Sequence, residues 1–298
     1  MRDIKVPTDA ANLFGTVLEG LERVMEDVDP EAVRRIVLST TLTTNAIVQK
    51  KIPEVGIIVS SGPGIDPRFF QTNEHFFTVA GSIDHRGREV EPVDPGEIER
   101  VSRDLQSRGI SHVGVVGKFS VRNPAHELQI KKQLGDAFEK VFLGHLISGH
   151  LNFPRRISTT YLNASVYPVH KEFFEAVQQS LETRGLTMPI RILKADGGNM
   201  NFASSIEFPG QTILSGPAAS VMGAVGYANN AVESLVLDIG GTTTDMTILT
   251  DGVPLLAPLG IKVGEYRTLI RSLDTHSIGV GGDSLVRLSD QRLAVGPE

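Results

Sequence analysis

The sequence contains no cysteine, which excludes disulfide bonds, thiolate metal ligands and a cysteine nucleophile. Lysine and arginine form no run, and the formal net charge is −6, so the chain offers no basic footprint for nucleic acid or for an anionic membrane. No apolar run approaches the roughly 18 to 20 residues that span a bilayer, and the first five residues are too polar to open a signal peptide. We therefore expect a cytoplasmic protein that binds neither nucleic acid nor membrane.

Internal repeats, low-complexity segments and metal-binding histidine spacings such as His-x-x-x-His are also lacking, so we expect neither a solenoid nor a zinc site. What remains is a chain of 298 residues, of which 40% are hydrophobic and 21% are charged. That composition is typical of a globular protein with a sizeable core, long enough for two domains.

Short apolar runs alternate with amphipathic stretches along the chain, which predicts an α/β structure with a sheet covered on both faces. The predicted strands are Ile36–Leu38, Val55–Val59, His112–Val116, Val141–Leu143, Ile190–Leu193 and Leu235–Leu237. Helices are expected from Leu13 to Met25, after Asp94 and after Pro124, since aspartate caps a helix start and proline suits its first turn.

A long helical segment from Ile157 to Glu182 contains Pro168, so we expect it to break or kink just before that residue. The main boundary between two closely packed halves is predicted between Gly185 and Pro189, where this helix ends and a new strand begins.

The strongest chemical signal is a strand, a glycine-rich turn and a second strand between Leu235 and Leu249. Glycine lets backbone amides approach phosphate oxygens closely, threonine hydroxyls add donors, and flanking carboxylates can hold magnesium or orient a water molecule. An ordinary hairpin with polar turn residues is the alternative, but it does not explain the bracketing aspartates. The turn residues are Asp238, Ile239, Gly240, Gly241, Thr242, Thr243, Thr244 and Asp245.

Two further segments precede this turn. A helix opening near Ser215, with Gly216 in its first turn and small residues on one face, either crosses beneath a nucleotide cleft or simply packs tightly on a sheet. Asp196 and Gly197 follow the strand Ile190–Leu193, and polar groups at such a strand end usually face a ligand crevice, although a connecting turn is the alternative.

Two more candidates lie further apart. Thr41, Thr44 and Asn45 belong to a hydroxyl-rich segment between a strand and a helix, which suits an anion or substrate cradle, with helix capping as the alternative. His276, in a second glycine-rich segment, is a candidate base or ligand, but a lone histidine is more often a structural hydrogen-bonding residue.

Taken in order, these segments resemble the hydantoinase/oxoprolinase family, specifically its hydantoinase A-type subunit, which also occurs in ATP-dependent acetone carboxylases. The resemblance runs through most of the chain. The segments that carry it are Thr40–Ala46, Ile157–Ala164, Asp196–Gly198, Ser215–Ala219, Asp238–Asp245 and Gly279–Ser284.

The resemblance implies an actin-like fold, as in sugar kinases, Hsp70 and actin, with two RNase H-like halves. On this reading residues 1–187 form the family's N-terminal domain and residues 188–298 its hydantoinase A-type domain. The family's usual upstream Asp-Gly-Gly-Thr turn and its downstream adenine-contacting region are not in the sequence, so we expect the fold to be incomplete at both ends.

The implied activity is ATP-dependent opening of a cyclic amide through phosphoryl activation of its carbonyl, with magnesium as cofactor. The resemblance assigns catalytic and metal-binding roles to Asp238 and Asp245. It places Gly240, Gly241, Thr242, Thr243 and Gly216 around the nucleotide. It assigns Thr41, Thr44, Asn45, Asp196, Gly197 and His276 to the substrate.

A hydantoinase B-type subunit is the implied partner and a small cyclic amide or related carbonyl compound the implied substrate. Leu38-Ser39 stands where the family usually has His-Gly, which puts the usual substrate specificity in question. Two alternatives remain: a non-catalytic actin-like nucleotide-binding or assembly module, and another actin-like small-molecule kinase.

Overall fold

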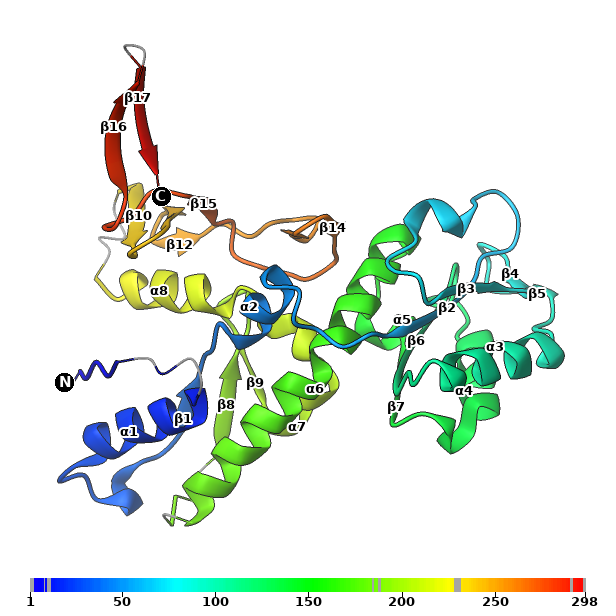
Figure 1. Ribbon diagram of the computed structural model, residues 1–298, viewed down its shortest axis with the longest axis horizontal. Coiled ribbons are helices and arrows are strands. Elements are labelled where there is room, and N and C mark those ends of the chain that lie inside the picture. Colours follow the sequence, from blue (N-terminus) through cyan, green and yellow to red (C-terminus); the bar gives the residue numbers. More distant parts are fainter. Residues whose placement is uncertain are drawn as a thin grey trace.

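The computed structural model describes residues 3–7, 9, 12–183, 185–186, 189–227, 232–289 and 292–296. The chain is a mixed α/β structure, as the alternating pattern predicts, and it has three parts that can be followed in Figure 1. These are a lobe formed by residues 52–150, a central body crossed by a long helix, and a C-terminal part that is mostly β-structure.

The lobe is built on a parallel four-stranded sheet with the order β3-β2-β6-β7. Alternate residues of β2 point to opposite sides, so Ile57 and Val59 enter one core and Ile58 enters another. The core containing Ile58 lies beneath α3 and α4, and the other core is shared with α6. This sheet is therefore covered on both faces, as expected.

The bounds of the lobe follow from its apolar runs and its caps, such as Asp94, whose side chain accepts a hydrogen bond from the Gly96 amide at 2.8 Å. Its elements are β2 Gly56–Ser60, η2 Pro67–Phe70, β3 Phe76–Val79, β4 Ser82–Ile83, β5 Glu89–Glu91, α3 Pro95–Ser107, β6 His112–Gly117, α4 Ala125–Leu134, η3 Gly135–Ala137, β7 Lys140–Leu143 and α5 Gly144–Ile147.

The central body joins segments that are far apart in the sequence. Strand β1 pairs in parallel with β8, with Ile36 opposite Ile190, and β8 pairs antiparallel with β9. This pairing crosses the division at residue 187, which itself stays a prediction. The elements are α1 Leu13–Met25, η1 Pro30–Ala32, β1 Ile36–Leu38, α2 Leu42–Val48, α6 Phe153–Thr183, β8 Ile190–Leu193, β9 Asn199–Asn201, α7 Phe202–Glu207 and η4 Pro209–Thr212.

Helix α6 runs without interruption through Pro168, so the break expected there is wrong, and the alternative of a kink stays a prediction. Proline removes one backbone donor, but the helix buries side chains at both ends, with Ile157 in the core it shares with the lobe and Leu181 in a core with α1 and β1. Packing at both ends outweighs the missing hydrogen bond. None of the helices in the described ranges is long and apolar enough to cross a bilayer.

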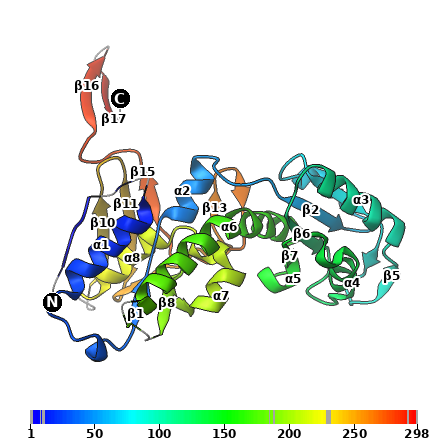
Figure 2. The same ribbon diagram turned by 60° about the horizontal axis from the view of Figure 1, so that its bottom comes forward.

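The C-terminal part places α8 against an antiparallel sheet in which β11 lies between β10 and both β12 and β15. Beyond it, the hairpin β16–β17 stands away from the rest of the chain in both views (Figure 1, Figure 2). The elements are α8 Ser215–Val225, β10 Ser234–Ile239, β11 Thr244–Thr250, β12 Val253–Pro254, β13 Lys262–Val263, β14 Tyr266–Arg267, β15 His276–Ile278, β16 Leu285–Ser289 and β17 Arg292–Gly296.

Candidate functional site

The glycine-rich turn joins β10 to β11 as the sequence predicts. Asp238 and Asp245 are direct cross-strand partners at its base, and the Gly240 amide closes the turn by donating to the Thr243 carbonyl at 2.9 Å. The backbone amides of residues 241–243 donate to no acceptor within the described chain, and these residues are exposed. The turn therefore presents free N–H donors next to two carboxylates.

The second glycine-rich segment lies against this turn. The Gly282 amide donates to the Gly240 carbonyl at 2.9 Å, and the Asp283 amide donates to the Gly241 carbonyl at 2.7 Å. A Cβ atom on Gly281 would lie 2.5 Å from the Gly241 carbonyl oxygen, so a side chain there would separate the two backbones. The contact fixes the turn while leaving its amides free.

The two aspartates lie on the face of the sheet that packs on α8. Asp238 lies two residues after Val236 and Asp245 lies four residues before Leu249, so the aspartates share a face with these two side chains. Val236 and Leu249 pack against the apolar side chains of that helix. The Ser277 hydroxyl of β15 donates to the Asp245 carboxylate. Asp238 has no such partner in the described residues, so its carboxylate oxygens are available to a ligand.

His276 lies on the opposite face of the same sheet. It pairs with Met246 of β11, one residue out of step with the pair of Ser277 and Asp245, and successive side chains of a strand alternate between faces. His276 is exposed there, on the face that also contains the exposed apolar side chains of β10. The structure therefore does not bring His276 together with the aspartates.

The hydroxyl-rich segment 39–45 docks on the start of α8. The Ser39 hydroxyl donates to the Ser215 carbonyl at 3.2 Å, and the Ser215 hydroxyl donates to the Thr40 carbonyl at 3.2 Å. The Leu214 amide donates to the Thr44 hydroxyl at 2.9 Å. Much of the polar capacity of the segment therefore connects the central body to α8, and the Thr44 hydroxyl keeps its own hydrogen for another partner.

Gly216 is required by this docking. A Cβ atom at that position would lie 2.8 Å from Cγ2 of Thr41, which is closer than carbon atoms approach without displacement. The Asn45 side-chain amide donates to the Thr41 hydroxyl at 3.3 Å. Thr41, Thr44, Asn45 and Gly216 therefore lie together, as four of the residues singled out from the sequence.

Asp196 and Gly197 form the tight turn between β8 and β9. The Asp196 carboxylate pairs with Lys194 Nζ at 3.0 Å and accepts the Gly198 amide at 3.0 Å. Gly197 has a φ of 78°, and a Cβ atom there would lie 2.7 Å from Sδ of Met222 on α8. The turn thus packs against α8, the same helix that packs on the sheet containing Asp238 and Asp245 (the aspartate sheet).

A cavity of about 320 Å³ opens beside this turn and includes Asp196 but none of the residues of the β10–β11 turn. The side chains of His150, Gln211 and Arg271 make no hydrogen bond or ion pair within the described chain, so they are free to contact a ligand. Its walls are formed by Ile147, Ser148, Gly149, His150, Thr159, Asn163, Lys194, Asp196, Phe208, Gly210, Gln211, Leu269, Ile270 and Arg271.

Arg156, which is fully buried, fixes the loop on one side of the cavity. Its guanidinium donates to the His150 carbonyl at 2.6 Å and to the Gly117 and Lys118 carbonyls at 2.5 and 2.8 Å. Burial lowers the pKa of Arg156, and the buried Glu127 carboxylate opposes that shift. This arginine positions the loop relative to β6 and does not itself line the cavity.

Part of this cavity could be predicted from the sequence. Thr159 and Asn163 lie within the segment Ile157–Ala164, and Lys194 lies two residues before Asp196, so all three could have been named as candidate ligand-binding residues. Nothing in the sequence marks His150 or Arg271, because loops distant in the chain bring them to the cavity. Residues 269–271 line it and residues 276–278 pair with β11, so one segment links the cavity to the aspartate sheet.

The β10–β11 turn suits a magnesium-bound polyphosphate. Two neighbouring carboxylates offer the oxygen ligands that magnesium prefers, and free amides in a glycine-rich turn form an anion-binding concavity.

Two family models match the chain and together span most of it. The model described as hydantoinase/oxoprolinase N-terminal region matches residues 1–138, and the model described as hydantoinase/oxoprolinase matches residues 156–298.

Curated relatives agree with this assignment. The α subunit of caprolactamase from Pseudomonas jessenii is 26% identical over 286 residues, which covers 87% of this chain and 40% of that relative. The 5-oxoprolinase of Saccharomyces cerevisiae is 26% identical over 249 residues, covering 78% of this chain and 18% of the relative. The chain spans less than half the length of these relatives.

Solved structures show the same fold. A nucleotide-free structure of acetone carboxylase, described as ATP-dependent, matches with a TM-score of 0.78 at 20% identity, covering 98% of this chain and 46% of the other. The ATP-dependent caprolactamase of Pseudomonas jessenii matches with a TM-score of 0.76 at 23% identity over 98% of this chain and 46% of that chain. The chain therefore belongs to the hydantoinase/oxoprolinase family and is of the hydantoinase A type.

Proposed function

We propose that this chain is the nucleotide-binding part of an ATP-dependent hydrolase that opens a cyclic amide. The observation that carries the proposal is the β10–β11 turn, where Asp238 and Asp245 face each other beside three free backbone amides. Caprolactam and 5-oxoproline, the compounds named in two relatives, are both cyclic amides. Acetone carboxylase shares the fold, so the amide chemistry rests on those relatives and on the site.

Each residue of the turn has a distinct role in this proposal. Asp238 and Asp245 hold magnesium through their carboxylate oxygens, and Asp245, whose other contact is Ser277, also orients the attacking water. The amides of residues 241–243 and the threonine hydroxyls hold phosphate oxygens. Bound magnesium ATP supplies the phosphoryl group that activates the amide carbonyl oxygen. Gly216 keeps the start of α8 close to the segment that contains Thr41.

The cavity beside Asp196 is the proposed site of the ring. Its volume of about 320 Å³ lies at the lower end of the range for small-molecule sites. Phe208 and Leu269 offer apolar walls for ring methylenes, whereas Lys194, Asp196 and Arg271 offer charged groups for the amide and its substituents. The segment 269–278 places this cavity and the aspartate sheet on one continuous stretch of chain.

The family membership also suggests how the complete protein is assembled. We infer an actin-like fold of two RNase H-like halves, completed by segments or subunits outside this chain, with a hydantoinase B-type subunit as partner. The designation of the caprolactamase relative as a subunit supports a partner. With ATP as co-substrate, the reaction takes place in the cytoplasm.

Phosphate release from ATP tests the proposal, measured for the protein together with its hydantoinase B-type partner. Caprolactam, 5-oxoproline and hydantoin are compared with acetone, and at least one ring should stimulate magnesium-dependent hydrolysis. Asp238→Asn should reduce turnover by roughly a hundredfold or more, because a charged ligand to the metal is lost. Asp251→Asn, in the exposed turn at the far end of β11 with a φ of 52°, is the matched control and should leave turnover unchanged.

A second variant separates the two parts of the site. Asp196→Asn should raise the KM for the ring while leaving the affinity for ATP unchanged. Hydrolysis that no ring stimulates would instead indicate an assembly module, and stimulation by acetone alone would indicate carboxylation. Equal loss in Asp238→Asn and Asp251→Asn would show that the β10–β11 turn has no special role.

A further inference from the structure

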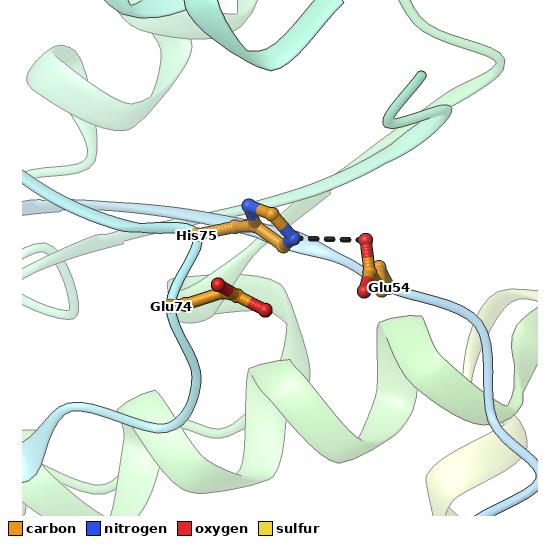
Figure 3. Close-up of side chains that lie close together, drawn as sticks. All are labelled: Glu54, Glu74 and His75. Carbon is orange, nitrogen blue, oxygen red and sulfur yellow. Dashed lines mark hydrogen bonds and ion pairs between the residues drawn. The ribbon is translucent and has the colours of Figure 1, made fainter. Parts of the chain in front are cut away.

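Three ligating side chains meet in the lobe, away from the β10–β11 turn. Glu54, Glu74 and His75 each place one ligand atom within 4.8 Å of the others (Figure 3). His75 is buried, with 5% of its surface exposed, and its Nε2 atom lies 2.9 Å from Oε2 of Glu54. Both glutamates are exposed, so a solvated ion can reach the group from outside.

The pairing of β2 with β3 holds this group together. The Ile57 amide donates to the His75 carbonyl at 2.9 Å, and the Asn73 side-chain amide donates to the Val55 carbonyl at 2.6 Å. Ile57 lies opposite Phe76 in the parallel register. Glu54 and His75 therefore precede neighbouring strands at the same edge of the sheet, and their backbones are positioned without any ion.

We propose that Glu54, Glu74 and His75 bind one divalent transition-metal ion of the zinc class. An imidazole nitrogen with two carboxylate oxygens is a ligand set that such ions accept, and two carboxylates balance the charge of a divalent ion. The set is not a purely acidic cluster, since its nitrogen ligand is a buried side chain fixed by the sheet. Nothing in the proposed function requires this ion.

The geometry needs adjustment only at the two exposed glutamates. In a tetrahedral zinc site two ligand atoms at about 2.0 Å from the metal lie roughly 3.3 Å apart. Nε2 of His75 and Oε2 of Glu54 are 2.9 Å apart, so the exposed Glu54 side chain must move by a few tenths of an ångström. Arg108, a nearby cation, is committed to Asp104 by hydrogen bonds of 2.9 Å, and Glu74 makes no hydrogen bond in the described chain.

The imidazole sets the expected affinity. Metal binding at Nε2 moves the histidine proton to Nδ1, which is buried and has no hydrogen-bond partner in the described residues. A missing partner for the second ring nitrogen typically weakens a metal site about 10- to 100-fold. We therefore expect a dissociation constant in the micromolar range, tighter than adventitious millimolar binding and weaker than a structural zinc site.

Calorimetric titration of zinc chloride into the 298-residue chain, without nucleotide, tests the site. Glu54→Gln/Glu74→Gln removes both charges but keeps an oxygen that can accept from His75, so the fold is retained. This double variant should weaken zinc binding at least tenfold. Glu91→Gln, which changes an exposed glutamate on β5, is the matched control. Asp238→Asn tests whether zinc binds instead at the β10–β11 turn. Both variants should bind zinc as the wild type does.

Two further readouts complete the test. Zinc should raise the melting temperature of the wild-type chain by several degrees at a hundredfold excess over the dissociation constant, and should not do so for Glu54→Gln/Glu74→Gln. Cobalt(II) bound at the site should give visible absorption bands that the double variant lacks. The proposal is overturned if the wild type binds no zinc below about 1 mM, if the double variant binds as the wild type does, or if binding is lost in Asp238→Asn instead.

Discussion

His170, in the middle of α6, should make the stability of the protein depend on pH. Its ring is buried against Phe174, with ring centroids 4.5 Å apart, and its Nε2 atom lies 3.2 Å from the Ser205 hydroxyl. Burial lowers the pKa of His170 from 6.5 to about 3. The folded protein thus keeps this imidazole neutral at a pH where the unfolded chain protonates it.

The sign and the size of the effect follow from this difference. Above pH 6.5 the imidazole is neutral in both states and contributes nothing. Below pH 6.5 the unfolded chain binds a proton that the folded chain does not, so the free energy of unfolding falls by about 1.4 kcal/mol for each pH unit. The loss from His170 is about 2 kcal/mol at pH 5 and approaches a limit of about 5 kcal/mol near pH 3.

Urea unfolding followed by far-ultraviolet circular dichroism at pH 7.5 and pH 5.0 measures this loss. His170→Phe cannot titrate, so its free energy of unfolding should fall about 2 kcal/mol less than that of the wild type between these two pH values. His85→Gln, in an exposed turn, should lose as much as the wild type. Burial also lowers the pKa of His112, but that contribution is common to all three proteins. Equal losses in wild type and His170→Phe would refute the reasoning.

Three further predictions concern local packing, hydrogen bonding and helix capping. Gly216→Ala should destabilise the protein by about 1 to 3 kcal/mol because its Cβ meets Cγ2 of Thr41, and Thr41→Ser should recover most of that loss in the double variant, as measured by urea unfolding. Thr44→Ala leaves the Leu214 amide without its acceptor and should cost about 1 to 3 kcal/mol, whereas Thr44→Ser should be nearly neutral in the same assay. Asp94→Ala removes a helix cap and should lower stability by about 1 kcal/mol, with Asp94→Asn close to wild type by thermal unfolding.

The elements that the sequence predicts well are those specified by local chemistry. The run Ile36–Leu38 is a strand, as its β-branched and apolar residues favour, and Asp94 caps α3 through a hydrogen bond two residues away. The β10–β11 hairpin follows from two strands joined by a glycine-rich turn. Each of these depends on neighbours within a few residues, which is the range that a sequence pattern reports.

The remaining features depend on tertiary contacts. Pro168 does not interrupt α6, because burial at both ends of the helix outweighs one lost hydrogen bond. His150 and Arg271 join the cavity from loops more than 100 residues apart in the chain. His276 was a candidate by its glycine-rich context, but strand alternation turns it to the face opposite Asp245. No periodicity in the sequence carries this information.

Helix α6 connects the core shared with the lobe to the core that contains side chains of α1 and β1. With 31 residues and a rise of 1.5 Å per residue it is about 46 Å long, and its two ends belong to different cores. Thr159 and Asn163, which line the cavity, precede Pro168 on this helix. The free energy needed to bend the helix is smallest at Pro168, because proline has no backbone N–H and one helical hydrogen bond is already missing there. We therefore expect any change in the angle between the lobe and the sheet that contains β1 to bend α6 near Pro168.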